Sequence, residues 1–189
     1  MVVLGIDPGS RRCGYGAVSR RGTCLSALAS GVIVPAEAPL APRLARIFDE
    51  ISAVIARTRP DAVSVESAFC GASARSALVL GQARGVVLAA AARAGVPVFE
   101  YAPAEVKRAF TGSGRAEKVQ MVRTARAIFG IDAELADEAD ALAVAVCHLA
   151  SAPAAAVRPS RRGGPAVRAR AATAASALRS SVRRYGSGA

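Results

Sequence analysis

Four acidic residues have the type and spacing that metal chemistry requires. Asp7 ends the apolar run VVLGID and Glu66 ends the alternating run DAVSVE, while Asp137 and Asp140 lie three residues apart in a stretch of helical period. Side chains at i and i+3 share one face of a helix. Clustered carboxylates repel one another, which raises their pKa values unless cations neutralise them. The pattern therefore predicts a cation site.

The ligand types indicate which cation this site takes. Oxygen ligands favour Mg²⁺, with Mn²⁺ as a substitute. The only histidine is His148, and the four cysteines have no zinc-type spacing, which argues against zinc. Two ions about 4 Å apart can activate a water, bind a phosphate and stabilise the leaving oxygen. We therefore expect phosphodiester hydrolysis.

Each acid also has an ordinary structural interpretation. Asp7 begins the turn sequence Asp-Pro-Gly, Asp137 can favour a helix N-terminus, and Glu66 can be a strand-end surface residue. Glu138 points about 100° away from Asp137 on a helix, so we assign it to solvent or to an outer shell. Taken one at a time, the acids do not establish a site.

The elements that must position these acids form an α/β pattern. The run VVLGID reads as a buried strand, followed by strands over 14–18 and 26–34 with a turn between them. Apolar residues at helical spacing predict a helix over 40–57, which Arg59-Pro60 ends. The next strand ends at Glu66 after this helical crossover, so it should lie parallel to the first. Asp7 and Glu66 then end neighbouring parallel strands, where reactive groups gather in open α/β sheets.

The second half of the chain alternates short strands and helices. We expect a helix over 73–94, a strand over 96–100, and helices over 104–110, 116–129 and 134–150. Gly81 and Gly85 lie four residues apart in the first of these helices, so another backbone can approach that face. Both a dimer contact and a tight contact with the chain's own sheet fit this spacing.

Charge divides the chain near residue 151. Of a net charge of +11, eight units come from arginines within 151–189, a segment rich in Ala, Arg and Ser that contains no acid. We predict one domain over 1–150 and a disordered tail over 151–189, which adds only salt-sensitive attraction to phosphates. No apolar stretch is long enough to cross a membrane and no signal peptide is apparent, so we expect a cytoplasmic protein with reduced cysteines.

Lysine is rare in this chain. Of 25 basic residues only Lys107 and Lys118 are lysine, and the remainder are arginine. Chance on an exposed helix and a positional requirement for a compact cation explain this equally well.

Several separated segments together resemble the RuvC family of Holliday junction resolvases. The resemblance rests on LGIDPGSRRCGYG at 4–16, VESAF at 65–69, SALVLGQARG at 76–85, VFEYAPAEVK at 98–107 and DEADALAVA at 137–145. It covers nearly all of residues 1–150, and long motifs in a fixed order are specific.

This resemblance implies a ribonuclease-H-like mixed sheet flanked by helices, a homodimer with two active sites, and paired nicks in opposing strands of a four-way DNA junction during recombination and repair. It assigns the catalytic metal-binding role to Asp7, Glu66, Asp137 and Asp140, and two Mg²⁺ ions to each site. The same resemblance implies that four residues contact DNA, with the branch-migration proteins RuvA and RuvB as partners. These four residues are Phe69, Arg75, Lys107 and Lys118.

The chain departs from the family pattern in the loop 70–75, which bears on loop contacts and cleavage-sequence preference. It also has Glu138, which adds a negative charge beside the metals, and a tail longer than is typical of the family. Three other functions fit parts of the sequence. GIDPGS is similar to the first phosphate loop of kinase-like and actin-like ATPases, but no second phosphate loop is visible. A related nuclease acting on structured RNA or in transposition is the second, and a non-catalytic junction-binding protein is the third.

Overall fold

The computed structural model describes residues 1–67, 73–130 and 136–151. The strands are β1 (Val2–Asp7), β2 (Cys13–Arg21), β3 (Cys24–Ile33), β4 (Ala62–Glu66) and β5 (Val98–Tyr101). The helices are α1 (Leu40–Thr58), α2 (Ala74–Arg93), α3 (Pro103–Thr111), α4 (Lys118–Phe129) and α5 (Ala136–Ser151).

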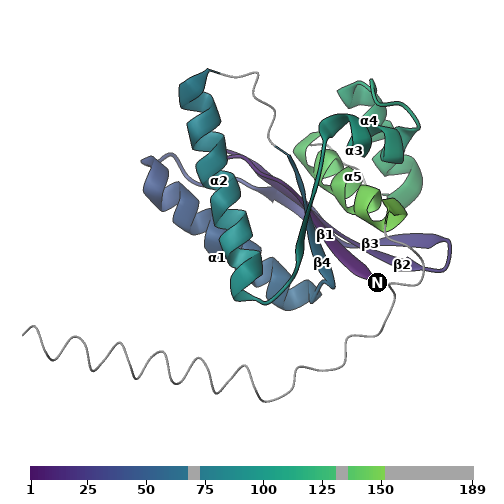
Figure 1. Ribbon diagram of the computed structural model, residues 1–189, viewed down its shortest axis with the longest axis horizontal. Coiled ribbons are helices and arrows are strands. Elements are labelled where there is room, and N and C mark those ends of the chain that lie inside the picture. Colours follow the sequence, from purple (N-terminus) through teal and green to yellow (C-terminus); the bar gives the residue numbers. More distant parts are fainter. Residues whose placement is uncertain (68–72, 131–135, 152–189) are drawn as a thin grey trace, which may run out of the picture. The chain divides into compact units, whose positions relative to one another are not determined.

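The five strands form one mixed sheet in the order β3-β2-β1-β4-β5 (Figure 1). β1, β2 and β3 are antiparallel neighbours, joined by the short loop 8–12 and by a tight turn at Gly22. β4 and β5 are added parallel to β1 through the crossovers that contain α1 and α2. The predicted α/β class, the opening hairpins and the parallel pairing of β1 with β4 are confirmed.

The alternation of side chains along β1 separates two layers of core. Leu4 and Ile6 belong to the cluster that α1 and α2 cover, whereas Val3 packs with residues of α5. Figure 1 shows α1 and α2 on one side of the sheet and α5, with α3 and α4 beyond it, on the other. Because side chains alternate with a period of two, Asp7 faces α5 together with Val3 and Gly5.

α1 forms as its apolar period predicts. Its buried residues are Ile47, Ile51, Val54 and Ile55, which all face the sheet. The helix ends where Arg59 takes a left-handed conformation (φ 45°) immediately before Pro60, a residue that cannot continue a helix. The predicted end of this helix is confirmed to within one residue.

α5 is buried along nearly its whole length, with ten buried residues from Ala139 to Leu149. It lies so close to the sheet that a Cβ atom on Gly5 would stand 2.0 Å from the carbonyl oxygen of Ala141. Glycine is therefore required in β1 at this point, because any side chain would push the helix away from the strand.

Some predicted boundaries differ from the structure. β5 begins at Val98 and not at Val96, because Pro97 has no N–H to donate to a sheet. α4 begins at Lys118 and not at Ala116, since Glu117 is its N-cap and its backbone N–H donates to the side chain of Gln120. The predicted start of the last helix at residue 134 and the predicted tail from 152 onward lie outside the described residues.

The glycine pair of α2 makes no close contact with the sheet. A Cβ atom on Gly81 or Gly85 would meet nothing within 4 Å among the described residues. The tight intramolecular contact that was one interpretation of this spacing is therefore wrong. Across the described ranges, no helix combines the length and the apolar character that a membrane span requires.

Candidate active site

Two of the predicted acids end adjacent parallel strands, as expected. Ile6 of β1 pairs with Val65 of β4, so the next residues in register, Asp7 and Glu66, lie side by side at the carboxyl end of the sheet. Ser64 donates its hydroxyl to the carbonyl oxygen of Val144 in α5, which shows that the alternate residues of β4 face α5. Glu66 therefore faces the same side of the sheet as Asp7.

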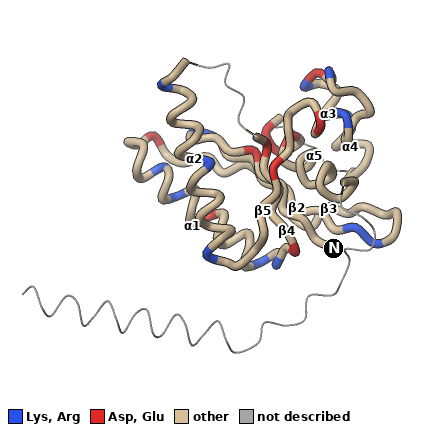
Figure 2. Tube along the Cα trace, viewed as in Figure 1, with Lys and Arg blue, Asp and Glu red and all other residues tan. Residues whose placement is uncertain are grey.

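The other two acids are contributed by the first turns of α5. Asp137 and Asp140 lie one helical turn apart, half-buried, at the end of the helix nearest the strand ends. A Cβ atom on Gly14 would stand 2.0 Å from the carbonyl oxygen of Asp137, so β2 and the start of α5 are in backbone contact. Figure 2 shows acidic positions gathered where the central strands end beside α5. The structure thus brings together all four predicted acids.

Burial and mutual repulsion strongly perturb Asp7. Burial, followed by the charges of Asp140, Glu66 and Asp137, raises the pKa of Asp7 from 3.8 to about 7. Burial is also the largest cause that raises the pKa of Glu66 and that of Asp140. A carboxyl cluster of this kind favours either a proton or a cation. Both choices neutralise charge that the fold holds away from water.

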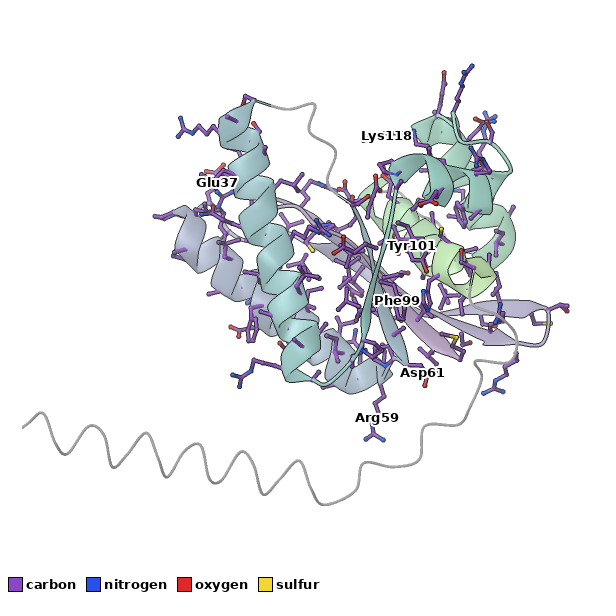
Figure 3. The ribbon with its side chains drawn as sticks, in the orientation of Figure 1. Glu37, Arg59, Asp61, Phe99, Tyr101 and Lys118 are labelled. Atoms are coloured by element: carbon purple, nitrogen blue, oxygen red, sulfur yellow. The ribbon has the colours of Figure 1, made fainter. Side chains whose placement is uncertain are left out.

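Lys107 and Lys118 both act electrostatically on this cluster. Lys118, the first residue of α4, lowers the pKa of Asp7 and of Asp140 against the effect of burial. Lys107, in α3, lowers the pKa of Glu66 and of Asp140. Figure 3 labels Lys118 at the end of α4. Of the two sequence-based explanations for the rare lysines, the structure favours a positional requirement.

Arg12 is a site residue that sequence reasoning missed. Its Nε lies 2.5 Å from a carboxylate oxygen of Asp137, and it joins the loop after β1 to the start of α5. The only sequence signal was its place in the segment 4–16, five residues after Asp7. The ion pair joins residues 125 positions apart, which no local pattern predicts.

The donor set of the cluster fits a divalent cation. All four groups are carboxylates, and oxygen ligands suit Mg²⁺ and similar hard ions. Within the described residues, however, no three His, Cys, Asp or Glu side chains are arranged tightly enough to hold one ion, and Asp137 is paired with Arg12. Only Oδ2 of Asp137 is paired with Arg12, so a bound ion would use Oδ1 or displace the guanidinium.

The remaining predicted DNA-contact residues are not joined to the acids by any described contact. Arg75 is exposed in the first turn of α2. Phe69 lies outside the described residues, so its assignment stays a prediction.

A polar contact that the sequence did not predict joins β5, the strand beside Glu66, to α5. Tyr101, which pairs with Glu66 in the sheet, forms a 2.6 Å hydrogen bond between its hydroxyl and Nδ1 of His148. The His148 ring also packs against Phe99, with ring centroids 4.4 Å apart. His148 is buried among these contacts. Figure 3 shows Phe99 and Tyr101 together beside α5.

A mixed five-stranded sheet with helices on both faces, and with acids at the strand ends facing a helix, defines the ribonuclease-H-like fold class of nucleases. The yeast mitochondrial Holliday junction resolvase Ydc2 shares this fold with a TM-score of 0.56 at 15% identity, over 77% of this chain and 76% of that chain.

Comparisons with known proteins narrow the class to one family. The model of the family "Crossover junction endodeoxyribonuclease RuvC" matches residues 3–148. A RuvC protein from Anaeromyxobacter sp. (strain K) is 69% identical over 150 residues, which cover 79% of this chain and 81% of the relative. The relative from Anaeromyxobacter sp. (strain Fw109-5) is 58% identical and covers 97% of both chains.

A solved structure agrees with these relatives. Thermus thermophilus RuvC in complex with a Holliday junction substrate superposes with a TM-score of 0.74 at 38% identity, over 79% of this chain and 93% of that chain. The chain belongs to the RuvC family of crossover junction endodeoxyribonucleases.

Proposed function

We propose that this protein resolves Holliday junctions by metal-dependent hydrolysis, making paired symmetric nicks in opposing DNA strands during recombination and repair. The observation that carries the proposal is the convergence of Asp7, Glu66, Asp137 and Asp140 from two strand ends and one helix. Metal-dependent phosphodiester hydrolysis uses anionic groups that hold cations against a phosphate, and this cluster supplies such groups. The protein is expected to act in the cytoplasm.

The four carboxylates would hold the metal, which we infer to be two Mg²⁺ ions with Mn²⁺ as a substitute. When bound, these ions polarise the phosphate and lower the pKa of a coordinated water. Asp7 is the central ligand, because its carboxylate interacts with all three of the others. Its partial burial limits the access of bulk water, which strengthens the electrostatic interactions of this carboxylate.

The other site residues position the substrate and balance its charge. Lys107 and Lys118 would contact the scissile phosphate or the charge that develops on it, since both act electrostatically on the acids. Arg12 would orient Asp137 for metal binding through its ion pair with that carboxylate. Phe69 would stack on an unpaired base at the crossover, and Arg75 would contact the backbone.

Symmetric nicks require two active sites, and we propose that a homodimer supplies them. The glycine face of α2 fits this role, because Gly81 and Gly85 leave space for a second backbone. Leu78, on the same helix, exposes 65% of its surface although it is a large apolar residue. RuvA and RuvB are the expected partners at the junction.

The test offers labelled four-way junction, linear duplex and RNA/DNA hybrid to the purified protein with Mg²⁺. We expect symmetric cleavage of the junction and little cleavage of the other two. The Asp7→Asn variant is the matched control, because it keeps the shape of the side chain and removes its charge. We expect cleavage to fall by a factor on the order of 1000, as for loss of a central electrostatic group.

Two results would contradict the proposal. Cleavage of the hybrid without cleavage of the junction would assign the protein to another substrate class. Normal junction cleavage by Asp7→Asn would show that the acids identified here are not the metal ligands.

A further inference from the structure

A hollow lined by arginines lies beside the candidate active site, on the other side of the loop that follows β1. It consists of two adjoining cavities of about 430 and 330 Å³, which share Arg43 and the residues 34–36 and 38 of the connector as lining. We call this feature the arginine groove. Its charged lining residues are Arg11, Glu37, Arg43 and Arg46.

Three arginines outnumber Glu37 and the Glu50 that pairs with Arg46, so the groove has a net positive charge. Arg46 is held at its rim by an ion pair with Glu50 one turn along α1, with N···O 2.6 Å. Arg43 donates to the carbonyl oxygen of Ser10 at 3.3 Å and so ties α1 to the loop after β1. Glu37 is exposed in the connector between β3 and α1, where Figure 3 labels it.

Among the described residues, one side-chain donor of the groove has no acceptor, and the end of α1 beside it has no side-chain cap. Within the described part of the chain, the Nε of Arg43 is buried without a hydrogen-bond partner. The N-terminus of α1 has no side-chain cap on Pro39 and no acid in its first turn. Unpaired backbone N–H groups and the helix dipole favour an anion there. The arginines and the helix end therefore favour the same kind of ligand.

The position of the groove indicates which anion it binds. The loop 8–12 leaves β1 at Asp7, and two neighbouring residues of this loop serve the two sites, since Arg12 pairs with Asp137 and Arg11 lines the groove. Cys13 at the end of the loop pairs with Ile33, the residue before the connector. The groove is thus at the same end of the sheet as the carboxylates, one loop away.

A DNA strand held at the carboxylates continues past them with one phosphate per about 3.4 Å of helix axis. Arginine forms paired hydrogen bonds with phosphate oxygens, whereas the apolar connector and Pro42 offer no base-reading groups. We propose that the arginine groove binds the phosphodiester backbone of the junction strand next to the cleavage point. This inference rests on the proposed function.

The test measures binding of four-way junction to the full-length protein without divalent cation, over a range of salt concentrations. For Arg11→Ala/Arg43→Ala we expect the dissociation constant to rise roughly tenfold and the salt slope to fall by about 2, one for each lost phosphate contact. Arg57→Ala is the matched control, because Arg57 is exposed in the last turn of the same helix. It should bind within about twofold of the parent.

A second variant acts in the opposite direction and leaves the packing intact. Glu37 is exposed, so Glu37→Gln removes the acid of the groove without opening a cavity. We expect it to bind junction about two- to threefold more tightly, as removal of one like charge near phosphate predicts. Asp49→Asn, an exposed acid of α1 that does not line the groove, should leave affinity unchanged.

The outcomes separate this inference from the proposed function. If the parent binds and cleaves junction but the groove variants bind as their controls do, the groove is not a DNA site while the resolvase function stands. If inorganic phosphate raises the unfolding temperature of the parent and not of Arg11→Ala/Arg43→Ala, while junction affinity is equal, the groove takes free phosphate and the DNA assignment is overturned. If the parent neither binds nor cleaves junction, both proposals fall.

Discussion

The two faces of the sheet are packed in different ways, and the difference explains where the site is. On the α5 face backbone meets backbone, since Gly5 and Gly14 leave no room for a Cβ atom beside α5. On the opposite face, large aliphatic side chains such as Ile47 and Ile51 fill the space between α1 and the sheet. Close packing fixes a helix relative to a strand more tightly than flexible side chains do. The four acids lie on the tightly fixed face.

The charged groups near the two faces also differ in the free energy that their burial costs. The carboxylates of the α5 face are partly buried and repel one another, which raises the pKa of Asp7 to about 7. The arginine groove lies at the margin of the other face, where Arg46 has a side-chain exposure of 64%. Burying like charges is costly without a cation, whereas exposed charges cost little. Partly buried carboxylates suit a metal site, and exposed arginines suit a site for backbone phosphates.

The largest effect is expected from breaking the close packing. Gly5→Ala places a methyl group in the backbone of α5, and the helix has to move away from β1. We expect the free energy of unfolding to fall by about 3 kcal/mol or more, as for overpacking that backbone cannot relieve. Denaturant unfolding followed by circular dichroism measures this.

The matched control for Gly5→Ala is Gly81→Ala in α2, where a Cβ atom meets nothing in the chain. Alanine in a helix interior should stabilise the monomer by roughly 0.5–1 kcal/mol. Equal effects of the two substitutions would contradict the contrast between the faces.

The second effect concerns the cost of the buried acids in the metal-free protein. The pKa of Asp7 is raised in the folded state, so the folded state keeps a proton that the unfolded chain has lost. The stability that this proton contributes to the folded state is fully present below pH 3.8 and is lost as the pH rises to about 7.

Asp7→Asn removes this titration. We expect the variant to be more stable than the parent above about pH 7 and the difference to vanish near pH 4. Unfolding free energies of both proteins across this range, without divalent cation, provide the measurement. A constant difference would show that Asp7 is not the group that titrates. Added Mg²⁺ should stabilise the parent and not Asp7→Asn.

A third, smaller effect concerns Lys107 and Lys118, which act electrostatically on the acids. Lys107→Ala and Lys118→Ala are each expected to lower the cleavage rate about 10- to 100-fold, because each removes a positive charge from the reacting phosphate. Single-turnover cleavage of junction at saturating protein measures this rate. The controls are Arg108→Ala in α3 and Arg123→Ala in α4, both exposed. Controls as slow as the lysine variants would indicate a general loss of charge.

The smallest effect is expected from the basic tail. Removing residues 152–189 keeps α5 complete and takes away eight arginines. We expect cleavage at saturating protein to change by less than about twofold and binding to weaken only at low salt, because the lost attraction is non-specific. A loss larger than that of Lys107→Ala at moderate salt would overturn the division between domain and tail.

Local pattern was enough to predict most of the fold. The strand ends at Asp7 and Glu66, the helical period of α1 and the stop at Pro60 follow from residue spacing and are confirmed. The boundaries that differed, at Pro97 and Glu117, depend on single backbone hydrogen bonds that periodicity does not detect. The choice between the two interpretations of Gly81 and Gly85 needed the neighbours of those residues.

By itself, the sequence determined which residue types are present and how strands and helices space them. That is why the four acids and the two lysines were predicted from motifs and composition. Only the tertiary structure decided that Arg12 pairs with Asp137, that Tyr101 binds His148, and that arginines of a loop and a helix line one groove. These contacts join residues far apart in the chain, and their formation depends on how closely α5 and α1 pack on the sheet.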